Sequence, residues 1–190
     1  HQLGAAAGRR GPGLSEYVMA GLFSIRPGHA GDFAGLQQIE IDAFETLFAA
    51  GGVYGEASSS ADAELQHYID AGMLLVAVDE QDQPIGYVGA ILGGGWLHVS
   101  EIDVAPVWQR KGVGRSLMSA VLEAGRIRGV VAATLTTDRS VPFNAPSYAS
   151  LGFRILAVDE LPDHLRRILA QEHAAGFDPA RRVAMKFTYS

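Results

Sequence analysis

One stretch of the chain, from Ser100 to Leu122, constrains the fold most, because it reads as a strand, a glycine-bearing turn and a helix in immediate succession. Its first residues alternate and are partly β-branched, which is typical of a strand. Pro106 cannot donate to a sheet ladder, so the strand is predicted to end near Ala105. From Val113 onward apolar residues recur at helical spacing, which predicts that a helix follows the turn directly.

The turn from Gln109 to Gly114 is predicted to bind phosphate. The N-terminus of the following helix presents free backbone N–H groups and a partial positive charge. Gly112, like Gly114, has no Cβ, so a ligand can approach the backbone closely. Three cations add full positive charge at the same end: Arg110, Lys111 and Arg115. Together these features favour a bound phosphate or pyrophosphate.

Two familiar nucleotide-binding motifs do not fit this turn. A P-loop needs Gly-x-x-x-x-Gly-Lys-Ser/Thr, whereas Lys111 comes before its glycine. A dinucleotide fingerprint needs a third glycine, where this chain has Leu117, and needs its first glycine directly after the strand. The phosphate ligand is therefore expected to belong to another class.

A different motif does fit. The pattern Gln-x-x-Gly-x-Gly from Gln109 to Gly114, preceded by Ile-x-Val-x-Pro from Ile102 to Pro106, resembles the acyl-CoA-binding motif of the GNAT N-acetyltransferase superfamily. A second stretch, from Asn144 to Phe153, is also similar to that family: its tyrosine, four residues before Gly-Phe, matches a position where many members carry a catalytic acid. The two motifs occur in the family's order, separated by a helix and a strand.

The resemblance implies a set of functional residues. Acyl-CoA is expected to contact Ile102, Val104, Gln109, Arg110, Lys111, Gly112, Val113, Gly114, Arg115, Asn144 and Tyr148. The backbone N–H of Val104 would stabilise charge that develops on the thioester oxygen. Glu101 is the expected general base for the amine, and Tyr148 the acid for the thiolate leaving group.

Each of these residues has an ordinary structural alternative. The three cations of the turn are also consistent with a solvated surface, Arg115 more so than Arg110 and Lys111. Glu101 is also consistent with a solvent-facing or ion-paired strand residue, and Tyr148 with a packing residue. Asn144 reads as the N-cap of its helix, followed by Pro146 in the first turn.

The order of elements predicts an α/β fold. Strands are expected at Leu22–Arg26, Met73–Val78, Pro84–Leu92, Trp96–Val104, Val130–Thr136, Phe153–Val158 and Arg182–Tyr189. Helices are expected at Asp32–Ala50, Ala61–Ala71 (with Ser60 as its cap), Val113–Arg128, Asn144–Leu151 and Leu161–Ala174. The prediction is a mixed, mostly antiparallel sheet of about seven strands with helices on both faces. The crossover helix makes the fourth and fifth strands parallel, and the resemblance implies that this central pair splays apart.

Composition narrows the alternatives further. With 190 residues, we expect a flexible tail over residues 1–21 and one domain over residues 22–190. The chain has no cysteine, which excludes a thiolate nucleophile, fits a reducing compartment and suggests a cytoplasmic protein. A net charge of −6 argues against nucleic acid binding, and no apolar run approaches the ~20 residues of a membrane span. Five histidines lack paired metal-ligand spacing, so no metal is expected: His29, His67, His98, His164 and His173.

The resemblance therefore implies an N-acetyltransferase that uses acetyl-CoA as cosubstrate and acts on a primary amine by direct attack in a ternary complex. Two alternatives stay open, a CoA-binding regulatory module without catalysis and an acyltransferase with another acyl-CoA donor. The acceptor is a small-molecule or peptide amine, and the family also implies a homodimer. The aromatic candidates for an acceptor pocket are Phe44, Phe48, Tyr54 and Phe143, and core packing is the alternative for the first two. The acidic candidates that would hold a cationic acceptor are Glu40, Asp42, Glu45 and Glu56, and a polar helix face is the alternative for most of them.

Overall fold

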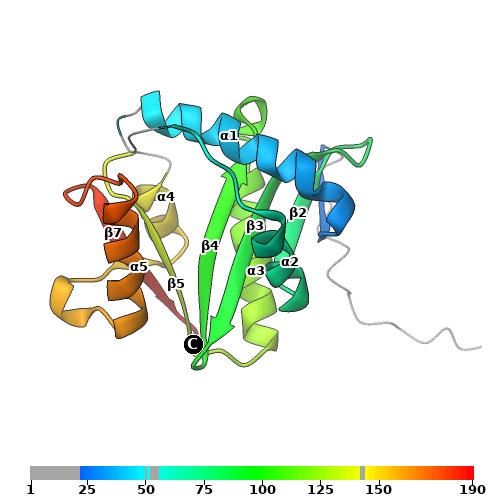
Figure 1. Cartoon of the computed structure of the whole chain (residues 1–190). Coiled ribbons are helices and arrows are strands. Elements are labelled where there is room, and N and C mark those ends of the chain that lie inside the picture. Colours follow the sequence, from blue (N-terminus) through cyan, green and yellow to red (C-terminus); the bar gives the residue numbers. More distant parts are fainter. Residues whose placement is uncertain (1–21, 50, 52–55, 142–143) are drawn as a thin grey trace, which may run out of the picture.

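A computed structural model describes residues 22–49, 51, 56–141 and 144–190, and the predicted tail lies outside these ranges. The described chain forms one seven-stranded sheet, in the order β1-β2-β3-β4-β5-β7-β6 (Figure 1). The strands are β1 (Ser24–Pro27), β2 (Leu74–Val78), β3 (Pro84–Gly93), β4 (Trp96–Val104), β5 (Ala132–Asp138), β6 (Arg154–Ile155) and β7 (Arg182–Thr188).

Five α-helices accompany the sheet. They are α1 (Phe33–Ala49), α2 (Asp62–Asp70), α3 (Val113–Ile127), α4 (Ala145–Ser150) and α5 (Asp163–Ala174). Within the described ranges, none of the helices is both long and apolar enough to cross a membrane.

The sheet is mixed, as predicted. Strands β1 to β4 form an antiparallel meander. Helix α3 then crosses over, so β5 runs parallel to β4. Strand β7 pairs antiparallel with β5 on one side and with β6 on the other. The predicted central parallel pair is therefore confirmed.

Strand alternation divides the core between the two faces of the sheet. On one face, α3 packs against the sheet through residues such as Leu117 and Met118, and Ala145 of α4 joins the same cluster. On the other face, α1 and α2 cover β2 and β3, while α5 covers the β7 side through Leu165. Between these two clusters on the second face, β4 and β5 carry buried polar side chains, and the His98 ring lies 2.9 Å from the Thr134 hydroxyl.

Three sequence expectations differ from the structure. Strand β5 begins at Ala132 rather than Val130, because the Val130 N–H donates to Gly125 at the end of α3 and so belongs to the helix terminus. Strand β6 is only two residues long, because the chain leaves the sheet edge for a 3₁₀ turn at Val158–Glu160. Ser60 does not cap α2: Ala61 holds that position without a side-chain hydrogen bond.

Candidate active site

The two central parallel strands separate soon after they meet. Strands β4 and β5 pair only from Trp96–Ala132 to His98–Thr134. Beyond these pairs, β4 continues to Val104 and β5 to Asp138 without further pairing between them, and Figure 1 shows the two strands diverging. The divergence creates a cleft in the middle of the sheet.

A β-bulge at Ser100 decides which side chains face this cleft. The register between β3 and β4 shifts so that Gly89 pairs with Glu101 but Ala90 pairs with Val99, which leaves Ser100 as the extra residue. A bulge of this kind bends its strand and reverses the alternation of the side chains beyond it. Here the reversal keeps apolar residues on the α3 face and turns Glu101 to the opposite face.

A cavity of about 960 Å³ occupies the cleft and reaches both faces of the sheet. At one end it is lined by the turn before α3 and by α4, and at the other by α1 and the segment before β7. Of the residues predicted to bind acyl-CoA, it brings together Ile102, Val104, Gln109, Arg110, Gly112, Val113, Gly114, Arg115, Asn144 and Tyr148. Lys111 is not among the lining residues, and its ammonium lies 5.3 Å from the centre of the Trp108 ring.

The glycine turn leaves its backbone open. Gly112 has φ of +85°, and a Cβ built there would meet nothing within 4 Å. A Cβ on Gly114 would meet only the Val104 side chain, at 3.7 Å. Arg110 also has a positive φ, of 61°. No packed side chain therefore covers Gly112, and the residues that begin α3 line the cavity.

The end of β4 turns its polar backbone groups toward the cleft. The Ala105 N–H donates to the Ile85 carbonyl at 2.8 Å, which places Val104 at a non-hydrogen-bonded position of the β3–β4 ladder. The N–H and C=O groups of Val104 therefore point away from β3, toward the side where β5 has diverged. The carbonyl accepts a hydrogen bond of 3.2 Å from the Gln109 side chain, a contact that the sequence did not predict.

Three carboxylates meet on the opposite side of the cleft, and we call them the carboxylate cluster. Glu40 comes from α1, and Glu101 and Asp103 come from β4; one oxygen of each lies within 4.8 Å of the others. Burial, together with the negative charge of Asp103, raises the pKa of Glu101 well above its usual value. Burial also raises the pKa of Asp103 to about 7. Because the two groups titrate together, the pair retains a proton near neutral pH.

Two hydrogen bonds from Ser60 hold the Glu40 carboxylate in place without a ligand. Glu40 is 8% exposed, and its two carboxylate oxygens accept hydrogen bonds from the Ser60 backbone N–H at 2.8 Å and the Ser60 hydroxyl at 2.5 Å. The sequence predicted Ser60 as a helix cap, and a polar helix face was one interpretation of Glu40. Asp103 was not among the sequence candidates, although it stands two residues from Glu101 on the same strand and therefore on the same face.

Helix α4 contributes the two candidates from the second motif. Tyr148 is half-buried, and its ring lies edge-on to Phe153 with centroids 6.1 Å apart. Burial and the charge of Asp103 raise the pKa of Tyr148, so the hydroxyl keeps its proton. Asn144 occupies the N-cap position with Pro146 in the first turn, as the helix-cap interpretation expected, although its side chain makes no capping hydrogen bond.

The far wall of the cavity comes from segments near the C-terminus. Arg182 of β7 stacks on Phe177, 4.2 Å from its ring centre, and pairs with Glu172 of α5 at 2.6 Å. No sequence motif marked these residues, because only the fold brings α5 and β7 to the cleft. Among the acceptor-pocket candidates, Phe44 and Glu56 line the cavity, Phe48 is exposed, and Tyr54 and Phe143 lie outside the described residues.

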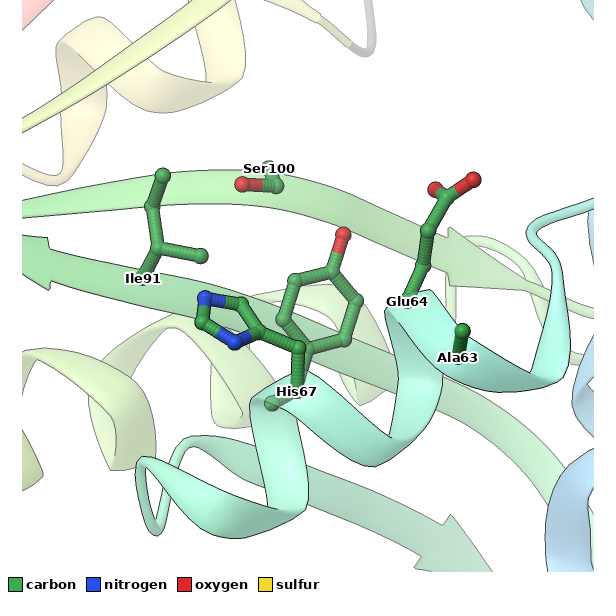
Figure 2. A pocket seen from close by; sticks show the side chains of 6 residues that line it. Ala63, Glu64, His67, Ile91 and Ser100 are labelled. Carbon is green, nitrogen blue, oxygen red and sulfur yellow. The ribbon is translucent and has the colours of Figure 1, made fainter.

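A smaller hollow of about 350 Å³ adjoins the cavity at Ser100, which lines both. Figure 2 shows Glu64 and His67 on α2 beside Ser100 of β4 and Ile91 of β3. Tyr68 completes the hollow, and its pKa is raised by burial and by the charge of Glu101. The hollow therefore lies between α2 and the strands β3 and β4, next to the cavity at Ser100.

Comparison with known proteins places this geometry in a family. Residues 52–166 match the family model of the acetyltransferase (GNAT) domain. Among solved structures, the chain is similar to the PaiA N-acetyltransferase from Thermoplasma acidophilum in complex with coenzyme A, with 16% identity and a TM-score of 0.66, over 88% of this chain and 99% of that one. It is also similar to the ribosomal-protein-S18-alanine N-acetyltransferase from Escherichia coli, with 20% identity and a TM-score of 0.58, over 89% and 95% of the two chains.

Proposed function

The chain belongs to the GNAT acetyltransferase family, and we propose that it transfers an acetyl group from acetyl-CoA to a primary amine by direct attack in a ternary complex. One observation carries the proposal: an unobstructed glycine turn at the start of α3 opens into the cleft between two diverging parallel strands. The turn offers amides and cations to a pyrophosphate, and the strands offer backbone hydrogen bonds to an extended pantetheine arm.

The residues around the cleft divide the binding of acetyl-CoA between them. The amides of Val113 and Gly114 suit the pyrophosphate, and Arg110 and Arg115 add positive charge beside them. The backbone groups of Val104 face the space that the pantetheine arm would fill. Its N–H is placed to stabilise negative charge on the thioester oxygen.

The carboxylate cluster and Tyr148 suit the two proton transfers of the reaction. An alkyl ammonium with a pKa of about 10.4 is neutral in only about one molecule in 2,500 at pH 7, so the attacking amine needs a base. Glu101, coupled to Asp103, takes that proton, and the amine nitrogen then forms the bond to the acetyl carbon while the C–S bond breaks. Tyr148 gives its proton to the departing thiolate, which balances the charge.

The Gly112→Glu variant tests the proposal. A side chain at a φ of +85° is strained, and a negative charge beside the start of α3 repels a pyrophosphate. We expect the affinity for CoA, measured by calorimetry, to fall by about a hundredfold or more.

The matched control is Gly129→Glu, at the other end of the same helix. Gly129 has φ of +75° and equally open surroundings, so it suffers the same backbone strain far from the turn. Unchanged CoA affinity in Gly112→Glu would refute the proposed binding mode. Normal CoA affinity in the unmodified protein, but no CoA release with acetyl-CoA and a panel of amines, would favour a regulatory CoA-binding module instead.

A further inference from the structure

We propose that the carboxylate cluster, together with the buried hydroxyl of Tyr87, is a receptor for an aliphatic primary ammonium group, so that the acceptor binds in its charged form. This inference rests on the proposed function and deepens it, because it names the residues that would recognise the ammonium group of the acceptor. It gives Glu40 and Tyr87 roles in acceptor recognition that no motif of the sequence indicates.

The spacing of the carboxylates suits one ammonium group. An R–NH₃⁺ group has three tetrahedral N–H donors. With charge-assisted hydrogen bonds of about 2.8 Å, the acceptors around such a nitrogen stand about 4.6 Å apart. The oxygens of Glu40, Glu101 and Asp103 all lie within 4.8 Å of one another, so a single ammonium can reach all three. The hydrogen bonds from Ser60 hold the Glu40 carboxylate where it can accept from such an ammonium group.

Tyr87 gives an independent indication of a ligand. Its side chain is 0% exposed, and its hydroxyl makes no well-formed hydrogen bond among the described residues, although the Ser60 side chain lies close enough to lower its pKa. It stands directly opposite Asp103 in the β3–β4 ladder. The charges of Glu101, Asp103 and Glu40 all act on the hydroxyl, which places it at the cluster. A buried hydroxyl without a partner costs free energy, which an N–H donor from a ligand would recover.

The cluster also lacks a counter-charge. Among the described residues, none of its three carboxylates forms an ion pair. Arg182 is the cation on the opposite wall, but its guanidinium is paired with Glu172 and stacked on Phe177. One oxygen of Asp103, Oδ2, is likewise buried without a hydrogen-bond partner. A bound cation would supply the charge that the protein does not.

Binding should therefore release protons. Near neutral pH the Glu101–Asp103 pair retains a proton, and an ammonium beside it favours the ionised form, so the proton leaves when the cation binds. The titratable and charged groups that face the pair are Glu40 of α1, Glu56 before α2, Tyr68 of α2, Tyr87 of β3, Tyr148 of α4 and Arg182 of β7. The affinity for an alkylammonium is expected to rise as the pH rises through 7.

The test is a calorimetric titration of the CoA-saturated protein with butylammonium chloride. Buffers of different ionisation enthalpy report proton release directly, and butanol serves as the neutral analogue of the same shape. We expect butylammonium to bind with release of a proton and butanol not to bind. Glu40→Gln should weaken butylammonium binding by about tenfold or more, whereas Glu80→Gln, at an exposed acid in the turn between β2 and β3, should not change it.

A second variant guards against a folding defect in Glu40→Gln. Tyr87→Phe keeps the ring and removes only the unpaired hydroxyl, so it should fold normally and still weaken butylammonium binding. Equal binding of butanol, unchanged affinity in both variants, or displacement of butylammonium by Mg²⁺ or Ca²⁺ would overturn the inference. Because these measurements need no turnover, an absence of acetyl transfer with intact ammonium binding would count against the proposed function alone.

Discussion

The candidate acid and base differ in protonation because of the groups that surround each residue. Burial and nearby carboxylates raise the pKa of Tyr148, which keeps its hydroxyl protonated at neutral pH. The same two influences raise the pKa of Asp103 to about 7 and that of Glu101 further above its usual value. The Glu101–Asp103 pair shares one proton near neutral pH, so one of its two carboxylates stays ionised and can accept a proton, while Tyr148 lines the same cavity as the proton donor.

Replacement of Tyr148 by phenylalanine tests the role of the donor. A thiolate is a fairly good leaving group, so we expect kcat to fall by about ten- to a hundredfold, while the affinity for CoA stays nearly constant. Steady-state kinetics and calorimetry measure the two quantities. Tyr189→Phe is the matched control, because that hydroxyl donates to the Leu122 carbonyl at 2.7 Å, away from the cavity. Equal turnover in Tyr148→Phe and the unmodified protein would remove Tyr148 from the mechanism.

Strand β4 and helix α3 shape the cleft together. Simple alternation along β4 from Leu97 and Val99 would turn Glu101 into the apolar core under α3. The extra residue at Ser100 reverses the alternation, so Ile102 packs against that core instead and the acid faces the cleft. The glycine turn depends in the same way on α3, whose buried face anchors the open amides to the sheet.

Leu117→Ala tests how far the core under α3 supports the whole fold. The side chain is 0% exposed, so its truncation leaves a cavity and should lower the free energy of unfolding by about 2–5 kcal/mol. Ser119→Ala, at an exposed position of the same helix, should change it by less than about 0.5 kcal/mol. Urea unfolding monitored by circular dichroism gives both values. A loss below about 1 kcal/mol for Leu117→Ala would mean that α3 packs less tightly than the structure indicates.

For the whole molecule, the carboxylate cluster is expected to cost stability as the pH rises. The folded-state pKa of Asp103, about 7, and that of Glu101 lie above their unfolded values. The folded protein thus binds more protons than the unfolded one, and its stability falls as these protons are lost. Buried His98, with a pKa of about 4, acts in the opposite direction but only at lower pH.

Homodimer formation, which the family resemblance implies, stays a prediction.

Above the pH range in which His98 acts, we therefore expect the Tm of the free protein to fall as the pH rises from about 6.5 to about 8, where Asp103 loses its proton. Asp103→Asn removes one of these groups and lowers the pKa of Glu101, so its Tm should depend less on pH. Asp70→Asn, which removes an exposed acid at the end of α2, should leave the slope unchanged. Scanning calorimetry over this pH range measures the Tm of each protein. An equal change of Tm with pH in Asp103→Asn and in the unmodified chain would contradict the raised pKa values.

The sequence by itself determined the order of the elements, the glycine turn and the parallel central pair. Each of these follows from local rules: Pro106 ends a strand, helical spacing of apolar residues begins at Val113, and a crossover helix makes its flanking strands parallel. The expected contacts of the turn residues with CoA remain a prediction, but their position around the cleft followed from the same motifs.

Only the tertiary structure decided the acceptor side of the cleft. Glu40 meets Glu101, 61 positions later in the sequence, because α1 lies over β4, and no local pattern encodes that contact. The bulge at Ser100 depends on the register with β3, and the unpaired hydroxyl of Tyr87 depends on what packs around it. Local spacing fixes what a segment becomes, whereas long-range packing fixes which charges share a buried space and therefore which protons they hold.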